Sequence, residues 1–183
     1  MKISKKFLLF IYYLYLSIAN HIVNKIPIFF VRKFIYKWFY FMKIGRKTNL
    51  HMGIRIFAPW KIEIGDNTVI NYNVTLDGRR GLKIGNNVDI AGNVQIFTLG
   101  HDINSPDYST KGGLVVIEDY CSLYTSSSVL PGCIIKKGSV VAFGAVVTKS
   151  TEEYSVVAGI PAHKTGERNH LLTYKLNYKR YFH

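Results

Sequence analysis

His101 lies where a regular six-residue pattern in this chain has its longest interruption. The interrupting stretch, 97–116, reads FTLGHDINSPDYSTKGGLVV, and the pattern resumes directly after it. An imidazole takes up and releases a proton near neutral pH, which suits histidine to general acid–base catalysis. A protruding loop that begins with a histidine therefore predicts a catalytic site at His101. The other five histidines are expected to be structural or solvated: His21, His51, His163, His170 and His183.

Aliphatic residues recur at every sixth position on both sides of the loop. A helix of 3.6 residues per turn does not keep such a stripe on one face, and an alternating strand would not place turn residues at every sixth position. Three six-residue sides can instead form one turn of a parallel β-helix, with the aliphatic residues inside. The stripe consists of Ile64, Ile70, Leu76, Ile84, Ile90, Ile96, Ile117, Leu123, Val129, Ile135, Val141 and Val147.

Small or medium side chains stand two residues before most of these positions. Because Cys121 and Cys133 belong to this second set, they are expected to be buried and to be poor nucleophiles. Two cysteines make no disulfide framework, which favours a reducing compartment. The corners of the coils are predicted at Gly, Asn and Asp, as in IGDN at 64–67 and IGNN at 84–87. The sequence shows no close spacing of His, Cys and carboxylates of the kind that binds metal.

Several of these motifs together resemble the hexapeptide-repeat acyltransferases. They are IGDNTVI, IGNNVDI, the histidine loop, and LPGCIIKKGSVVAFGAVVTKSTEEYSVVAGIPAHK. The resemblance covers residues 44–165 and is greatest for sugar and capsular polysaccharide O-acetyltransferases. It implies a left-handed parallel β-helix that forms homotrimers with active sites between subunits. It also implies acetyl-CoA as co-substrate, a sugar or polysaccharide acceptor, and no metal.

The same resemblance implies roles for individual residues. His101 matches the general base, and the backbone N–H of Thr125 matches the donor to the oxyanion. Asn71 matches an asparagine that contacts the acceptor sugar. Lys149 matches a lysine near the cofactor phosphates, and Lys164 or Arg168 is expected to act similarly. Two carboxylates, Asp77 and Asp102, are candidates for orienting His101 or binding sugar hydroxyls, although a solvated loop position is the simpler expectation for both.

Two aromatic residues depart from the family pattern. Relatives often have Trp-Ile-Gly where this chain has Ser122-Leu123-Tyr124, and a small residue where it has Phe143. The tryptophan and glycine lie along the path of the pantetheine arm. We expect Tyr124 and Phe143 to replace them as apolar contacts of that arm. The alternative is that these two aromatics block the groove and that acetyl transfer has been lost.

The N-terminal segment 1–43 differs in character from the rest of the chain. Residues 1–62 carry 12 of the 24 Lys and Arg, and no acid occurs before Glu63, although the net charge is +13 overall. Long apolar and aromatic runs beside these bases favour helices that lie on an anionic membrane surface over nucleic-acid binding. A partner interface and a cleaved signal peptide remain alternatives. The apolar run 7–19 is 13 residues long, shorter than the roughly 20 that span a bilayer.

Three segments and one leading function follow. Residues 1–43 form a membrane-associating helical segment, 44–165 the β-helix with loop 97–116, and 166–183 a basic tail. The leading hypothesis is an acetyl-CoA-dependent O-acetyltransferase for a surface polysaccharide or its lipid-linked precursor, held in the cytoplasm on the inner face of the cell membrane. N-acetylation of an amino-sugar nucleotide, acetylation of an antibiotic or of serine, and a non-catalytic β-helix scaffold are the alternatives.

Overall fold

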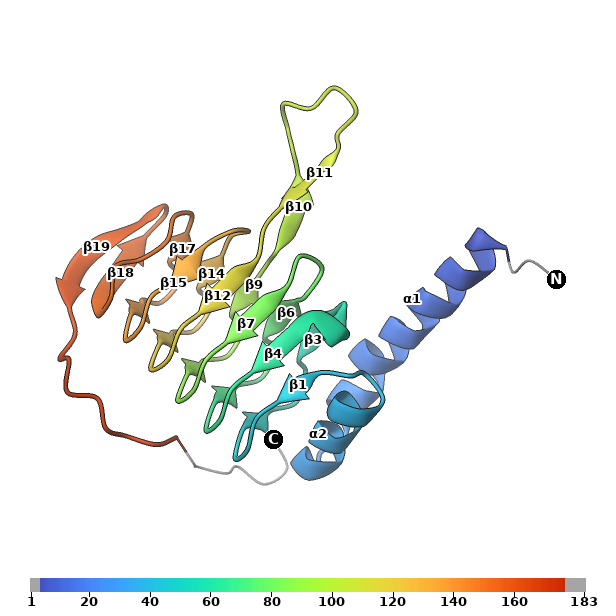
Figure 1. Cartoon of the computed structure of the whole chain (residues 1–183), viewed down its shortest axis with the longest axis horizontal. Helices are drawn as coiled ribbons and strands as arrows, with labels where there is room; N and C mark the ends of the chain where they lie inside the picture. The colour runs from blue at the N-terminus through green and yellow to red at the C-terminus, as the bar shows by residue number, and fades with distance from the viewer. Residues whose placement is uncertain (1–3, 177–183) are drawn as a thin grey trace.

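The chain folds into a three-sided parallel β-helix with two helices at its N-terminal end. A computed structural model describes residues 4–176. Each side of the β-helix is a sheet of short parallel strands, and successive strands along the chain pass from the first side to the second and the third (Figure 1). Five coils contribute one strand to every side. The predicted β-helix is confirmed.

The strands are two or three residues long in the coils. The first side holds β1 (Lys43–Ile44), β4 (Ile62–Ile64), β7 (Leu82–Ile84), β12 (Val115–Ile117) and β15 (Ile134–Ile135). The second side holds β2 (Asn49–Leu50), β5 (Val69–Ile70), β8 (Asp89–Ile90), β13 (Ser122–Leu123), β16 (Val140–Val141), β18 (Ser155–Gly159) and the antiparallel β19 (Ala162–Glu167). The third side holds β3 (Arg55–Phe57), β6 (Thr75–Asp77), β9 (Gln95–Ile96), β14 (Ser128–Val129) and β17 (Val146–Val147).

Aliphatic residues stack directly above one another inside the coils. On the first side the register pairs Ile44, Ile64, Ile84, Ile117 and Ile135 in one continuous row. All twelve residues of the predicted stripe are buried, and so are the small residues two positions before them. Stacked coils therefore share one continuous core, as expected for a solenoid. The stripe begins one coil earlier than the sequence indicated, because the turn around η2 (Pro59–Lys61) breaks the six-residue spacing.

Both cysteines lie inside this core. Cys121 is fully buried and Cys133 nearly so, and both thiols are free. Burial raises the pKa of the Cys121 thiol to about 12 and also raises that of Cys133. The thiolate form is therefore suppressed, which supports their predicted packing role.

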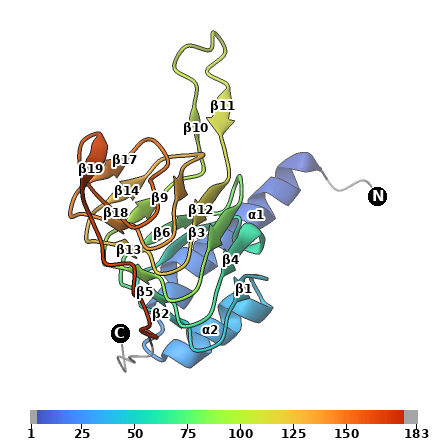
Figure 2. The ribbon, with the colours of Figure 1, turned by 60° about the vertical axis from the view of Figure 1, so that its left-hand side comes forward.

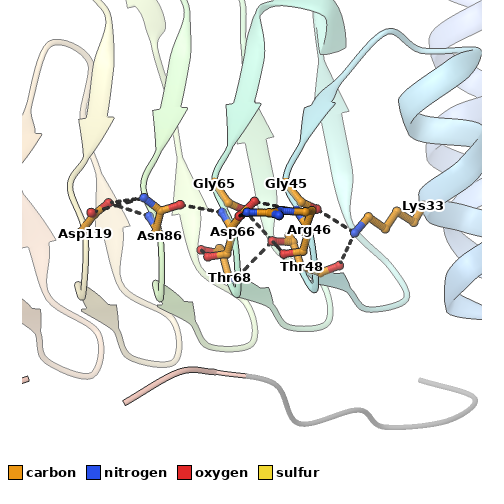
Figure 3. A network of polar contacts seen from close by, with 9 residues as sticks. All are labelled: Lys33, Gly45, Arg46, Thr48, Gly65, Asp66, Thr68, Asn86 and Asp119. Carbon is orange, nitrogen blue, oxygen red and sulfur yellow. Dashed lines mark hydrogen bonds and ion pairs between the residues drawn. The ribbon is translucent and has the colours of Figure 1, made fainter. Parts of the chain in front are cut away.

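A ladder of side chains ties the coils together at the corner between the first and second sides (Figure 3). Asp66 accepts the backbone N–H of Arg46 at 2.7 Å, Asn86 accepts that of Asp66 at 2.7 Å, and Asp119 accepts that of Asn86 at 2.6 Å. Each corner side chain thus satisfies a backbone donor of the coil before it. Lys33 extends the ladder to the N-terminal helices by donating to the carbonyl of Gly45 at 2.8 Å.

Two helices cover the first coil at one end of the β-helix. They are α1 (Lys5–His21) and α2 (Phe29–Trp38), joined through η1 (Val23–Lys25). The side chain of Asn20 pairs with both the N–H and the carbonyl of Ile56 on β3, which fixes α1 to the third side. The buried guanidinium of Arg32 donates to the carbonyls of Ile26 and Leu50, which fixes α2 to β2. Residues 5–25 are long and apolar enough to cross a membrane, judged by length and composition alone.

The loop predicted at 97–116 is a β-hairpin that projects from the coils. Its strands β10 (Leu99–His101) and β11 (Thr110–Gly112) are antiparallel, and both views show the hairpin standing clear of the solenoid (Figures 1 and 2). Gly112 is required at its base, because an added Cβ would lie 2.2 Å from the carbonyl oxygen of Thr98. The chain therefore leaves the solenoid at the corner after β9 and rejoins it at β12.

Asp77 anchors the hairpin to the preceding coil. Its carboxylate is fully buried, accepts the N–H groups of Thr98 at 2.9 Å and Leu99 at 3.2 Å, and pairs with Arg79 at 2.9 Å. Burial alone would raise the pKa of this carboxyl, but the hydrogen bonds from Arg79 and Thr98 outweigh it and the pKa is lowered. Asp77 is inaccessible to an acceptor and does not contact His101, so the structure gives it an anchoring role in place of the two that were expected.

Replacing this carboxylate should destabilise the fold in a pH-dependent way. Asp77→Asn should lower the free energy of unfolding at pH 7 by about 2 to 4 kcal/mol, because a neutral amide replaces a fully buried carboxylate that accepts two backbone N–H groups and pairs with the partly exposed Arg79. Since the folded-state pKa is depressed, this contribution is present above the ordinary Asp value of about 3.9 and is lost as pH falls through the folded-state value.

Urea unfolding at pH 7 and near pH 3 measures both effects. Glu153→Gln is the control, because Glu153 is exposed and forms no ion pair with the described residues. Equal stabilities for wild type and Asp77→Asn at pH 7 would contradict the anchoring role.

Candidate active site

His101 ends strand β10 of the projecting hairpin and is held there by the backbone of the loop that connects β10 to β11. Its Nδ1 lies 2.8 Å from the carbonyl oxygen of Tyr108, and the two rings stack at 4.3 Å between centroids, 7° from parallel. A carbonyl only accepts hydrogen bonds, so Nδ1 carries the proton and Nε2 keeps its lone pair. Nε2 is bonded to no group among residues 4–176, so the imidazole presents a basic nitrogen in the orientation that a general base requires.

An open cleft of about 620 Å³ lies beside His101. Its walls come from the hairpin strands and from two later coils at the same corner, between the third and first sides. Phe97, Leu130 and Pro131 give the cleft an apolar wall, and Lys111 and Thr148 add polar groups. Phe97, Leu130 and Thr148 each follow an inward aliphatic residue by one position, so they face outward. The six-residue spacing marks these three positions as outward-facing, but it does not distinguish them from the other outward-facing residues of the coils.

Asp102 does not orient His101. One of its oxygens accepts the N–H of Asn104 at 3.1 Å, and the other pairs with Lys111 at 3.2 Å. The hydrogen bond from Asn104 and the bond from Lys111 lower the pKa of this carboxyl. Both contacts stay within the hairpin, so the partner of His101 is the Tyr108 carbonyl, which sequence reasoning missed because a main-chain acceptor has no residue signature.

The lysines predicted at the cofactor lie on the last coil. Lys149 and Lys164 both border a smaller cavity of about 180 Å³, and Lys149 directly follows Thr148 of the His101 cleft. Lys164 pairs with Glu152 and Glu167, each at 2.8 Å, and these bonds raise its pKa. Its charge is already balanced within the chain, whereas Lys149 is exposed and forms no ion pair with residues 4–176. Lys149 is therefore the better placed of the two for an anionic ligand.

Arg168 lies away from the cleft, at the corner between the first and second sides. Its guanidinium donates to the carbonyl of Tyr120 at 2.8 Å and contacts the ring of Tyr174. These contacts fasten the C-terminal segment to the coils. The structure thus shows Arg168 holding the C-terminal segment in place, and its expected role near the cofactor stays a prediction.

The remaining predicted residues occupy the corner between the second and third sides. Tyr124 and Thr125 follow β13, and Phe143 follows β16 one coil later, with 5.3 Å between the Tyr124 and Phe143 ring centroids. Asn71 follows β5 at the same corner, is almost fully buried, and donates to the carbonyl of Ile90 at 3.0 Å. This corner and the corner that carries His101 lie at opposite ends of the third side of the coils. A six-residue side is roughly 15 to 20 Å long. One chain does not bring the two groups together.

Thr125 occupies a turn that leaves its N–H available. The N–H of Ser127 bonds to the carbonyl of Tyr124 at 3.1 Å, and Ser126 has a φ of 61°. This combination is typical of a type II turn with Thr125 at its second position. The Thr125 N–H donates to no acceptor within the described range 4–176, so it can donate to a ligand. No three His, Cys, Asp or Glu side chains in that range are grouped to hold a metal ion.

The sequence is similar to those of several acetyltransferases. It is 30% identical over 140 residues to "Putative colanic acid biosynthesis acetyltransferase WcaF" of Escherichia coli K12, covering 73% of this chain and 77% of that one. It is 33% identical over 126 residues to the galactoside O-acetyltransferase of Lactococcus lactis, covering 67% and 54%.

The fold has a close match among solved structures. The hexapeptide-repeat acetyltransferase VCA0836 of Vibrio cholerae, complexed with acetyl coenzyme A, superposes with a TM-score of 0.80 over 92% of this chain and 93% of that chain, at 23% identity. No protein-family model matches the sequence. Since the sequence similarity spans most of both chains and the fold agrees, the chain belongs to the hexapeptide-repeat acetyltransferase family.

Proposed function

We propose that this chain transfers the acetyl group of acetyl-CoA to a sugar hydroxyl of a surface polysaccharide, such as a capsule, O-antigen or exopolysaccharide, or of its lipid-linked precursor. The observation that carries the proposal is the His101 imidazole, whose Nδ1–H is bound to the Tyr108 carbonyl while Nε2 remains free beside an apolar cleft. The relatedness to acetyltransferases that include a colanic acid enzyme supports the class of acceptor.

His101 would act first as base and then as acid. Its Nε2 removes the proton of the acceptor hydroxyl as the oxygen attacks the thioester carbonyl carbon. The C–S bond then breaks, and the sulfur leaves as a thiol that receives the same proton from the imidazolium. The Tyr108 carbonyl stabilises the charged imidazolium and holds the ring in place. No covalent enzyme intermediate is needed, in agreement with the burial of both cysteines.

The residues around the cleft suit the chemical groups of acetyl-CoA, the proposed acetyl donor. The apolar wall of Phe97, Leu130 and Pro131 suits the pantetheine arm, and Lys149 stands beyond the cleft where a phosphate group would need a cation. The same base would also serve an amine acceptor, but no arrangement of the described residues favours an amino-sugar nucleotide over a sugar hydroxyl. A scaffold without activity would not need a fixed imidazole with a free nitrogen.

We propose further that the enzyme is a homotrimer with active sites between subunits. The separation of His101 from Thr125 on different corners supports this, because the Thr125 N–H stabilises the oxyanion only if it reaches the acetyl carbonyl. A neighbouring subunit can present its second-to-third corner to the His101 cleft of the first.

We also propose that the enzyme is attached peripherally to the cytoplasmic face of the cell membrane. In that position it would reach a lipid-linked acceptor from the cytoplasm.

Removal of the base should abolish most activity. His101→Ala should lower kcat about 10²- to 10⁴-fold while acetyl-CoA binding persists, the usual range for a positioned base. Release of CoA from acetyl-CoA with polysaccharide acceptors measures the effect. His170→Ala is the matched control, since His170 stacks on Tyr154 outside the cleft. Turnover near the wild-type rate in folded His101→Ala would remove the proposed mechanism.

The oxyanion donor can be deleted without changing the turn. Thr125→Pro removes only the N–H, and proline is favoured at the second position of a type II turn. We expect kcat to fall about 10²- to 10³-fold, the usual loss for one such donor. Thr125→Ala keeps the N–H and should retain nearly full activity. Equal activity of the two variants would show that this N–H is not used.

The paired aromatics should act on cofactor binding. Tyr124→Gly or Phe143→Ala should raise KM for acetyl-CoA roughly tenfold with little change in kcat, because burying an aromatic face against the arm stabilises ground and transition states alike by about 1 to 3 kcal/mol. Leu171→Ala, an exposed apolar residue elsewhere, is the control. Tighter acetyl-CoA binding in the variants, or none in the wild type, would mean that the aromatics obstruct the groove.

A further inference from the structure

Most of the exposed large apolar side chains of the described chain lie between residues 7 and 41, on the N-terminal helices and their connections. Two groups of them, residues 7–11 of α1 and the residues Phe30, Phe34, Trp38 and Phe41 of α2 and its following turn, are here together called the helical surface. These four aromatic side chains are 56 to 67% exposed. We propose that the helical surface docks on an anionic lipid bilayer, with α1 lying in the interface and not crossing it. This inference does not depend on which sugar is acetylated.

The first two turns of α1 are exposed on all sides in the described part of the chain. Phe7, Leu8, Leu9, Phe10 and Ile11 are consecutive residues, so they point to all sides of the helix, and each is at least 44% exposed. A helix that is apolar all round is normally surrounded by a protein core or by lipid. No part of residues 4–176 packs over these turns in the structure, and α1 extends past the first coil into open space (Figure 1).

The second helix presents a narrow aromatic stripe. Phe30, Phe34 and Trp38 follow one another at four-residue spacing on one face, and all are exposed. The buried Arg32 and Tyr36 lie on the opposite face, where Arg32 binds the carbonyl of Leu50. The orientation of α2 is therefore fixed by its buried face, and the aromatic stripe must point outward. Phe and Trp on such a face, next to Lys37, are typical of helices at a membrane interface.

The positive charge of the N-terminal segment favours an anionic lipid over a second copy of this chain as the partner of the helical surface. Residues 4–62 contain no Asp or Glu, and Lys5, Lys6, Lys25 and Lys37 form no ion pair within the part of the chain that the structure describes. A second copy of this chain would bring equal positive charge against the same surface. An anionic bilayer offers the opposite charge, at about 1 kcal/mol of attraction for each base near it. The helical surface therefore fits an anionic lipid surface better than a second copy.

The contacts of α1 with the β-helix and with the segment after α2 argue against a spanning position. Its C-terminal half is fastened by the two Asn20 bonds to Ile56, by the hydroxyl of Tyr15 to the carbonyl of Phe39 at 2.6 Å, and by the burial of Leu16 and Ala19. A helix that crossed the bilayer would have to lose these contacts. Only the first turns are free to enter the lipid, which suits a helix lying in the interface.

The proposed trimer would multiply this attachment. Rotation about a threefold axis parallel to the coil axis leaves the axial position of each atom unchanged. Three copies of α1 would therefore project past the same end of the assembly, the end at the first coil (Figure 1). A flat bilayer could then bind three helical surfaces at once, and avidity would strengthen the attachment beyond that of one. This step alone rests on the proposed trimer.

Vesicle flotation combined with Trp38 fluorescence tests the proposal. The chain has two tryptophans, so Trp60→Phe leaves Trp38 as the single reporter. We expect the full-length protein to float with vesicles of phosphatidylcholine and phosphatidylglycerol at least roughly tenfold more than with phosphatidylcholine alone. Trp38 emission should shift to the blue and should be quenched by lipids brominated on their acyl chains. High salt should release the protein only in part, because apolar burial is not screened.

Two variants distinguish docking through the helical surface from nonspecific adsorption to vesicles. Phe30→Ser/Phe34→Ser should lower vesicle binding at least about tenfold, since two aromatic side chains no longer enter the lipid. Leu171→Ser, at a site 84% exposed and outside the helical surface, should bind like the wild type. Both variants should release CoA normally with a soluble acceptor, so that loss of docking is distinguished from misfolding and from failure of the proposed reaction.

Two results would overturn the proposal. One is a full-length protein that stays unbound with vesicles of both compositions. The other is a protein that forms larger assemblies through the helical surface without lipid, because a second copy would then be the occupant. Quenching of Trp38 only by lipids brominated near the bilayer centre would contradict the interfacial position of the helices.

Discussion

The inward stacking of aliphatic residues on three sides fixes the position of every other group in this protein. Because each row continues in register from coil to coil, side chains that do not face the core can only point outward from a side or sit at a corner. The aliphatic rows occupy the interior. Chemistry must therefore be built at the corners, and a single chain keeps its three corners apart by the width of a coil.

The hairpin provides one part of the active site, the oriented base His101. Asp77 binds the backbone where the chain leaves the coils, and the loop between β10 and β11 brings the Tyr108 carbonyl to His101. The base is thus oriented by the main chain of its own loop, without a carboxylate partner. The second half of the site, the free N–H of Thr125 beside Tyr124 and Phe143, lies on another corner. The proposed trimer follows from this division.

Much of the fold could be predicted from the sequence, because a six-residue period is a direct record of coil geometry. The twelve aliphatic residues of the stripe, from Ile64 to Val147, and both cysteines are buried, as that period predicts. The first coil was not included in the stripe, since the irregular turn at Pro59 displaces it. The hairpin could be located but its internal contacts could not, because backbone acceptors such as the Tyr108 carbonyl carry no side-chain signature. Asp77 was a candidate for orienting His101 or binding sugar hydroxyls, and Arg168 for binding the cofactor. The structure shows both side chains bonded to backbone groups, contacts that charge alone does not reveal.

Mixed trimers test the division of the active site between subunits most directly. Coexpression of His101→Ala with Thr125→Pro gives assemblies in which some sites pair an intact His101 from one subunit with an intact Thr125 N–H from its neighbour. Random mixing makes about one quarter of the sites wild-type in a closed ring of three, so CoA release should recover to roughly that fraction of the wild-type rate. Each variant alone should remain nearly inactive. Mixed trimers that are no more active than the two separate variants would contradict a site shared between corners of adjacent subunits.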